Sequence, residues 1–230
     1  MQPVTEPLDK LVDGYRRFRS GTYQRQRQRY DALACKGQNP RVMVIACCDS
    51  RVDPTIVFDA APGEMFVLRH IAALVPPCER DGKHHSASAA IEFAVTQLEV
   101  SDIVVFGHGG CGGIAASLSR RFDHAPECDG GFIRNWMEIV APERDRVVAA
   151  AALSADIDAQ RALELAAIRL SIRNLRSFPF VSARDSERRL RLHGAFFDIG
   201  DGILRLLDSD AGRFVAVDYI DFEGELREVA

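Results

Sequence analysis

The pattern of apolar residues marks three short strands in the first half of the chain. Residues 42–45 and 103–106 are continuous apolar runs, and residues 65–70 form a further run after the Pro62-Gly63 turn. Unbroken runs rich in β-branched side chains are typical of parallel strands buried on both faces. The chain therefore predicts a parallel sheet built from these segments.

Helical spacing occupies much of the remaining chain. Apolar residues recur at intervals of three and four over residues 8–18, and the arginine-rich segment 21–34 predicts a second, polar helix. Its arginines are expected to face solvent or a subunit interface. Further helices are predicted over 86–98, 114–121 and 132–177, the first capped by Ser86 or Ser88.

The C-terminal part, residues 189–217, alternates apolar and polar positions around several glycines, which predicts an antiparallel meander or hairpin. The predicted fold class is α/β, with a mostly parallel central sheet, flanking helices, an N-terminal helical arm and a C-terminal antiparallel addition. We expect residues 1–36 to form the arm and residues 37–230 to form the α/β domain.

Composition narrows the classes of partner. The chain has 230 residues, 47% of them apolar, and its 33 acidic against 29 basic residues give a net charge of −4. Without a basic excess, no nucleic-acid partner is expected. No segment approaches the ~18 apolar residues of a membrane span, and no signal peptide is visible. The spacing of the six cysteines does not suggest a disulfide framework, so a cytoplasmic location is expected.

Candidate metal ligands follow two of the predicted strands. Cys47 comes directly after residues 42–46, and His108 and Cys111 come directly after residues 103–107. The carboxyl ends of parallel strands meet at one edge of a sheet, which is where open α/β sheets bind ligands. Two thiolates and one imidazole match a catalytic zinc site, which keeps a fourth position open. The neighbouring Cys48 is expected to lie in the core or beside the pocket.

Two charged residues follow the first cysteine and could share its face of an extended segment. Zn²⁺ lowers the pKa of a bound water toward neutrality, but two thiolate ligands make it a weaker Lewis acid than three histidines would. A nearby group must then help to orient the nucleophile. Asp49 is the candidate, and it can either bind the metal or pair with Arg51, which would leave the fourth position to water.

The combined motifs resemble the β-class carbonic anhydrases. The similarity lies in Cys-x-Asp-Ser-Arg at 47–51 and His-x-x-Cys at 108–111, and it extends to segments 69–77 and 88–95. It is strong over residues 34–121. The resemblance implies that Cys47, His108 and Cys111 bind Zn²⁺, and that Asp49 and Arg51 are the catalytic dyad.

The resemblance also implies a substrate pocket. Gln38 matches a glutamine that hydrogen-bonds substrate, Phe66 and Ile71 match apolar pocket positions, and Gly112 matches a backbone N–H donor. Position 44 is valine, whereas a bicarbonate-inhibited subgroup has tryptophan there, so the chain is more similar to the plant-like subgroup with an open site. It departs from the family at His70 and Ala73, which replace asparagines, and at Phe93, which replaces tyrosine.

The expected activity is the reversible hydration of carbon dioxide to bicarbonate and a proton. Two alternatives remain open at this point: hydrolysis of carbon disulfide or carbonyl sulfide at the same site, and a non-catalytic protein that binds zinc and bicarbonate. The expected partners are the small-molecule substrate and further copies of the chain, as a homodimer or a dimer-based higher oligomer.

Overall fold

The computed structural model describes residues 7–79, 85–123, 131–217, 219–220 and 226–227. The chain forms two compact units. One comprises residues 1–39 with 61–63, and the other comprises residues 40–60 and 64–230. Within the described residues, no helix is both long enough and apolar enough to cross a membrane.

The N-terminal unit is helical. It contains α1 (Pro7–Ser20), α2 (Thr22–Arg25) and α3 (Arg27–Lys36). The helix predicted over 21–34 is therefore interrupted at Gln26, which ends α2 and precedes α3. The rings of Phe18, Tyr23 and Tyr30 lie 5.1–6.0 Å apart and pack the three helices together.

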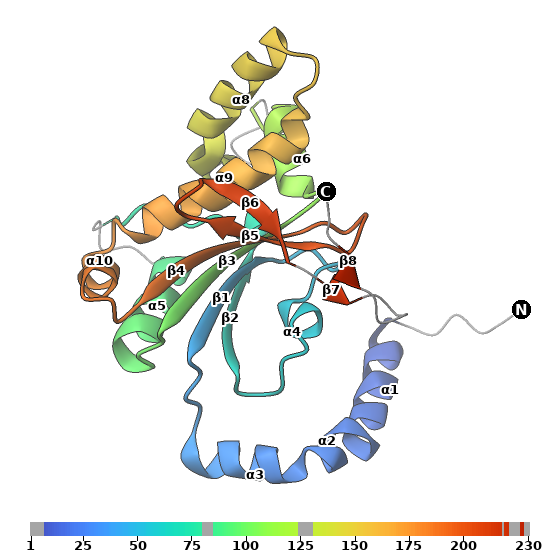
Figure 1. Ribbon diagram of the computed structural model, residues 1–230. Helices are drawn as coiled ribbons and strands as arrows, with labels where there is room; N and C mark the ends of the chain where they lie inside the picture. Colours follow the sequence, from blue (N-terminus) through green and yellow to red (C-terminus); the bar gives the residue numbers. More distant parts are fainter. Residues whose placement is uncertain (1–6, 80–84, 124–130, 218, 221–225, 228–230) are drawn as a thin grey trace, which may run out of the picture. The chain divides into compact units, whose positions relative to one another are not determined.

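The larger unit is built on a mixed sheet whose strand order is β2-β1-β3-β4-β5-β6 (Figure 1). Its strands are β1 (Val42–Cys47), β2 (Met65–His70), β3 (Asp102–His108), β4 (Arg191–Phe197), β5 (Leu204–Asp208) and β6 (Arg213–Ala216). The first four strands in the sheet are parallel, and β5 and β6 are added antiparallel. A separate pair, β7 (Tyr219–Ile220) and β8 (Leu226–Arg227), follows. The predicted fold class is confirmed.

One detail of the C-terminal prediction is wrong. We expected residues 189–217 to form only antiparallel pairs, but β4 lies parallel to β3, with Asp102 opposite Arg191. The physical reason is the long helical connection before β4. Helices can carry the chain back across a sheet, and a strand that follows such a crossover runs parallel to its neighbour.

Helices cover the sheet. They are α4 (Pro54–Val57), α5 (Ser86–Glu92), α6 (Gly112–Leu118), α7 (Phe132–Met137), α8 (Ala141–Leu153), α9 (Ala159–Leu175) and α10 (Pro179–Ser186). A π-helical turn, Phe93–Gln97, continues α5, and short 3₁₀ turns cover Ile71–Ala73 and Glu138–Val140. The predicted serine cap is wrong, because His85 occupies the position before α5 and makes no side-chain capping bond.

Both faces of the two central strands, β1 and β3, are covered. Met43 and Ile45 of β1 pack with Ile103 and Val105 of β3 against α5, α9 and α10. The alternate residues Val44, Ala46 and Phe106 face the other side, where Val57 and Phe58 of the α4 region pack on them. Burial on two sides explains why the strands are apolar without interruption.

Candidate metal centre

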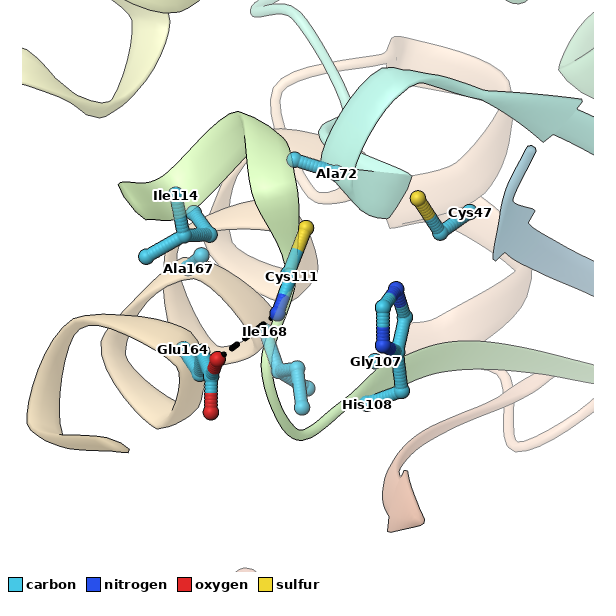
Figure 2. A pocket seen from close by; sticks show the side chains of 9 residues that line it. All are labelled: Cys47, Ala72, Gly107, His108, Cys111, Ile114, Glu164, Ala167 and Ile168. Carbon is cyan, nitrogen blue, oxygen red and sulfur yellow. Dashed lines mark hydrogen bonds between the residues drawn. The ribbon is translucent and has the colours of Figure 1, made fainter. Parts of the chain in front are cut away.

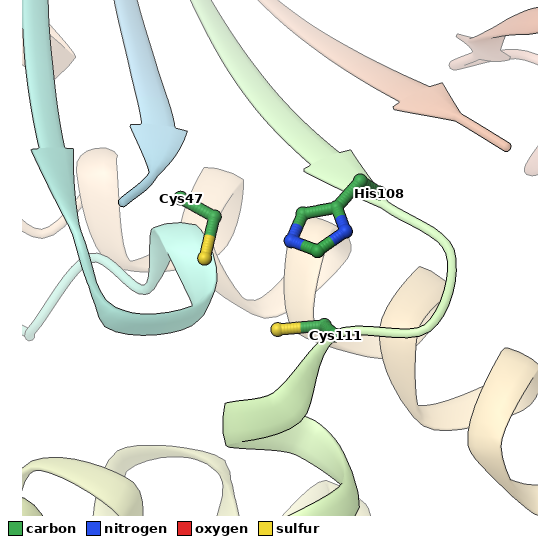
Figure 3. A group of neighbouring side chains, drawn as sticks. All are labelled: Cys47, His108 and Cys111. Carbon is green, nitrogen blue, oxygen red and sulfur yellow. The ribbon is translucent and has the colours of Figure 1, made fainter. Parts of the chain in front are cut away.

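Three side chains converge where β1 and β3 end. Cys47 is the last residue of β1, His108 is the last residue of β3, and these strands are parallel neighbours. Cys111 follows in the residue that precedes α6. The two sulfur atoms and a ring nitrogen of His108 all lie within 4.8 Å of one another (Figure 3). The three residues therefore lie together at one sheet edge, as the sequence predicted.

A tight turn brings Cys111 back beside His108. Gly110 has a φ of +65°, a left-handed conformation that glycine adopts without steric penalty. Gly109 donates its N–H to Phe197 at the end of β4, at 2.9 Å. The turn is thus fixed to the neighbouring strand, and it directs the Cys111 side chain toward Cys47.

The imidazole of His108 is oriented by its own loop. Nδ1 lies 2.9 Å from the carbonyl oxygen of Gly109, so Nδ1 carries the proton and donates it. Nε2 is buried and has no hydrogen-bond partner among the described residues. A buried nitrogen lone pair directed at two sulfurs is the donor arrangement that a tetrahedral Zn²⁺ ion requires, so the residues present fit this metal.

The cluster is enclosed. Cys47, His108 and Cys111 are 7%, 2% and 3% exposed, and they border a cavity of about 10 Å³. Hydrogen bonding from the Cys111 thiol lowers the pKa of Cys47, although burial opposes this, and the same bond together with burial raises the pKa of Cys111. A divalent cation bound between the sulfurs would displace their thiol protons.

Asp49 is held by Arg51. The Arg51 side chain donates to both carboxylate oxygens, at 2.9 and 2.6 Å, and its backbone N–H donates a third bond at 3.0 Å. These hydrogen bonds hold the pKa of Asp49 well below its usual range. Arg51 also donates to the carbonyl of Gly110, at 2.9 Å. The Asp49 carboxylate still lies 3.9 Å from Nε2 of His108, so it borders the cluster.

Arg69 fixes the loop that carries Cys47 and Asp49. Its guanidinium donates to the carbonyl oxygens of both residues, at 3.0 and 2.8 Å, and pairs with Asp53 at 2.6 Å. Our reading of the sequence used this residue only as part of a motif. Its positioning role depends on β2 lying beside β1, which residue spacing alone does not show.

Glu164 of α9 is a second residue that the sequence reading missed. It is 4% exposed, and its carboxylate accepts the backbone N–H of Cys111 at 3.0 Å (Figure 2). Gln160, one turn earlier, donates to the same carboxylate at 2.7 Å and to the Cys111 carbonyl at 3.2 Å. A signal was available, because an acidic residue between Leu163 and Ala167 on the apolar face of a helix needs a buried partner.

The predicted pocket residues are placed in different ways. Ile71 lies in the 3₁₀ turn after β2, where it packs close to Gly113, and Gly112 is the first residue of α6. Phe66 lies on β2 with its ring 5.9 Å from that of Phe93, and it does not line the small cavity beside the cluster. Gln38 belongs to the N-terminal unit, so its role stays a prediction.

Comparison with known proteins gives the family. Residues 42–204 match the family model described as carbonic anhydrase. Beta carbonic anhydrase 3 of Arabidopsis thaliana is 34% identical over 205 residues, which cover 89% of this chain and 78% of that protein. The chain belongs to the β-class carbonic anhydrases.

Solved structures of this class agree with the fold. The β-carbonic anhydrase CcaA superposes with a TM-score of 0.83 at 27% identity, covering 92% of each chain. A tetrameric β-carbonic anhydrase of Sordaria macrospora gives a TM-score of 0.75 at 28% identity, covering 87% of this chain and 96% of that one. The reaction of this carbonic anhydrase is the hydration of carbon dioxide, and its cofactor is zinc.

Proposed function

We propose that Cys47, His108 and Cys111 hold the zinc ion of this carbonic anhydrase. The observation that carries the proposal is the convergence of three ligand atoms within 4.8 Å, with Nε2 of His108 otherwise unpartnered among the described residues. When bound, Zn²⁺ supplies a Lewis acid that makes hydroxide available from water near neutral pH.

Asp49 and Arg51 form the catalytic dyad in this proposal. Three hydrogen bonds from Arg51 keep the Asp49 carboxylate ionised and turned toward the guanidinium. In that position the carboxylate accepts a hydrogen bond from the attacking water and fixes the direction of its lone pair. Because Asp49 is engaged by Arg51, we assign the chain to the subgroup whose fourth metal position stays open to water.

The substrate pocket is proposed on the resemblance. The backbone N–H of Gly112 and the side chain of Gln38 would hold the oxygen atoms of carbon dioxide or bicarbonate. Phe66 and Ile71 would supply apolar walls. We divide the chain functionally into a helical arm, residues 1–36, and a catalytic domain, residues 37–230.

The assembly is proposed to be a homodimer or a dimer-based higher oligomer in the cytoplasm. The described relative from Sordaria macrospora is tetrameric, which supports association. Leu8, Leu11 and Tyr15 expose 60–71% of their surface on α1, and such apolar side chains are expected to be covered by a second copy of the chain. The small molecules carbon dioxide and bicarbonate complete the expected partners.

The two alternatives receive no support from the comparisons. A carbon disulfide or carbonyl sulfide hydrolase would keep the same ligands, and a non-catalytic protein would need a disabled dyad. Both members of the dyad are present and paired here. Stopped-flow measurement of carbon dioxide hydration separates carbonic anhydrase activity from both alternatives.

Zinc analysis of adjacent cysteine variants tests the ligand set. Cys47→Ser should lose most of its zinc, because serine is a much poorer ligand than thiolate, and should lose activity with it. Cys48→Ser is the matched control, since Cys48 lies outside the cluster and is exposed, so the expectation of a core position was wrong. The control should keep about one zinc per chain. Equal zinc content in the two variants would contradict the assignment.

A further inference from the structure

Arg161, in the first turn of α9, lies between two carboxylates from different elements. Its guanidinium forms an ion pair with Asp198, which directly follows β4, and its Nε lies 3.7 Å from Oε2 of Glu164 on α9. The side chains of Glu164 and Asp198 are 2% and 17% exposed, so water alone cannot offset their charge. Arg161 therefore joins the helix to the loop that follows β4.

Each carboxylate supports the backbone beside one candidate metal ligand. Glu164 accepts the N–H of Cys111 at 3.0 Å (Figure 2). Asp198 packs on Gly109, since its Oδ1 lies 3.0 Å from the place that a Cβ would take on that glycine. The carbonyl of Gly109 in turn accepts from Nδ1 of His108. The two supports thus reach the two ligands that β3 and its turn supply.

The guanidinium itself is held in place by a buried ring. Cζ of Arg161 lies 4.5 Å from the ring centroid of Phe196, a fully buried residue of β4. The backbone N–H of Arg161 donates to Asp158, the residue that caps α9, at 3.0 Å. A planar guanidinium can stack on an aromatic ring while its N–H groups face carboxylates, and an ammonium group cannot do both.

We propose that Arg161 is a positioning residue of the metal centre, acting through Glu164 and Asp198. By holding these two carboxylates, it fixes the turn that carries His108 and Cys111. The inference rests on the proposed zinc ligands and adds a residue that supports them from a distance. Removing one partner of a buried ion pair leaves the other charge uncompensated, so the supports of the turn should rearrange when Arg161 is lost.

Zinc affinity is the first test. Arg161→Gln removes the charge and the fork of donors, and it should weaken zinc binding about 10–100-fold, the range typical of groups that orient metal ligands. Arg161→Lys keeps the charge without the planar fork, so its affinity should lie between those of the wild type and Arg161→Gln. Competition with a zinc chelator measures the three affinities, and circular dichroism checks that each variant is folded.

Arg169→Gln is the matched control on the same helix. Cζ of Arg169 lies 5.0 Å from the ring centroid of Phe214, and its guanidinium donates to the carbonyl of Gly212 at 3.0 Å. These partners belong to β6 and the turn before it, not to the ligand loops. The control loses a comparable set of contacts and should keep the zinc affinity of the wild type.

The spectrum of the cobalt-loaded protein separates positioning from stability. Co²⁺ bound by thiolates absorbs in the visible and near-ultraviolet, and the positions of its bands depend on the geometry of the ligands. At saturating Co²⁺ these bands should shift in Arg161→Gln and coincide with those of the wild type in Arg169→Gln. A residue that only stabilised the fold would lower the urea midpoint without moving the bands.

A double-mutant cycle tests whether Arg161 acts through its neighbour. In the Glu164→Gln background the carboxylate that Arg161 holds is gone, so Arg161→Gln should weaken zinc binding by a clearly smaller factor than it does in the wild type. Equal factors in the two backgrounds would contradict this route.

The possible failures are distinguishable. Wild-type zinc affinity and an unshifted cobalt spectrum in Arg161→Gln would overturn the role of Arg161 and leave the ligand set intact. A wild-type protein whose cobalt form lacks the charge-transfer absorption of thiolate ligands would overturn the ligand set, and this inference with it.

Discussion

Three residues beside the candidate metal ligands hold the ligand loops in place. Arg51 fixes Asp49, Arg69 fixes the backbone between Cys47 and Asp49, and Glu164 fixes the backbone of Cys111. Arg69 and Glu164 tie the two ligand loops to β2 and α9, and Arg51 also donates to the turn at Gly110. Outer groups of this kind orient ligands, and their removal weakens metal binding as well as stability.

Glu164→Ala tests this role for the buried carboxylate. The change leaves the N–H of Cys111 without its acceptor in a site with little water, so we expect a loss of about 2–4 kcal/mol in the free energy of unfolding. Zinc affinity should fall together with stability. Urea unfolding and competition with a zinc chelator measure the two effects.

Conservative and distant variants serve as controls for Glu164. Glu164→Gln keeps an oxygen that can accept from Cys111, so it should recover a large part of both properties. Glu187→Ala changes a glutamate that is more than half exposed, and it should alter stability by less than about 0.5 kcal/mol. If Glu164→Ala changed neither the free energy of unfolding nor the zinc affinity, the contact with Cys111 would not position its loop.

At the scale of elements, β3 must approach α9 closely. A Cβ atom added to Gly107 would lie 2.7 Å from Cδ1 of Ile168, a residue that is 2% exposed on α9. Gly107→Ala should therefore destabilise the protein by about 1–3 kcal/mol in urea unfolding. Gly112→Ala is the matched control, because no atom lies within 4 Å of its added Cβ. Equal effects of the two substitutions would argue against this packing.

An ion pair joins the beginnings of β3 and β4. Burial alone raises the pKa of Asp102, but hydrogen bonds from Arg191, Ser101 and His193 outweigh it and lower this pKa to about 2. A carboxyl whose pKa is lower in the folded state stabilises the protein above its unfolded pKa, and loses that contribution as pH falls through the folded value.

The stability difference between wild type and Asp102→Asn should consequently be constant above about pH 5. It should be about 1–2 kcal/mol there, and should shrink between about pH 4 and pH 2. Both proteins contain the metal site, so the effect of acid on that site cancels when the two are compared. Asp13→Asn is the control. It removes the acidic partner of an exposed ion pair on α1, and it should show no such trend. A difference that is independent of pH would contradict the assignment.

The whole molecule shows which features the sequence could predict. Apolar runs located β1 and β3, and the residues directly after them located Cys47, His108 and Cys111, because parallel strands end at a common edge. Hydrophobic periodicity and ligand spacing are local properties of the chain, so they can be recognised in the sequence alone. The direction of β4 depends on the crossover before it, and the carboxylate at Cys111 comes from a helix 53 positions later in the chain. Such long-range contacts leave no regular spacing in one sequence.

For the site as a whole, we predict that Cys47, His108 and Cys111 hold zinc while Asp49 stays paired with Arg51. A crystal structure of the zinc-loaded protein at about pH 7.5 tests it most directly. We predict a tetrahedral ion bound by Cys47, His108 and Cys111, a water or small anion in the fourth position, and Asp49 still paired with Arg51. Asp49 bound to the metal, or zinc held by a different set of residues, would contradict the account.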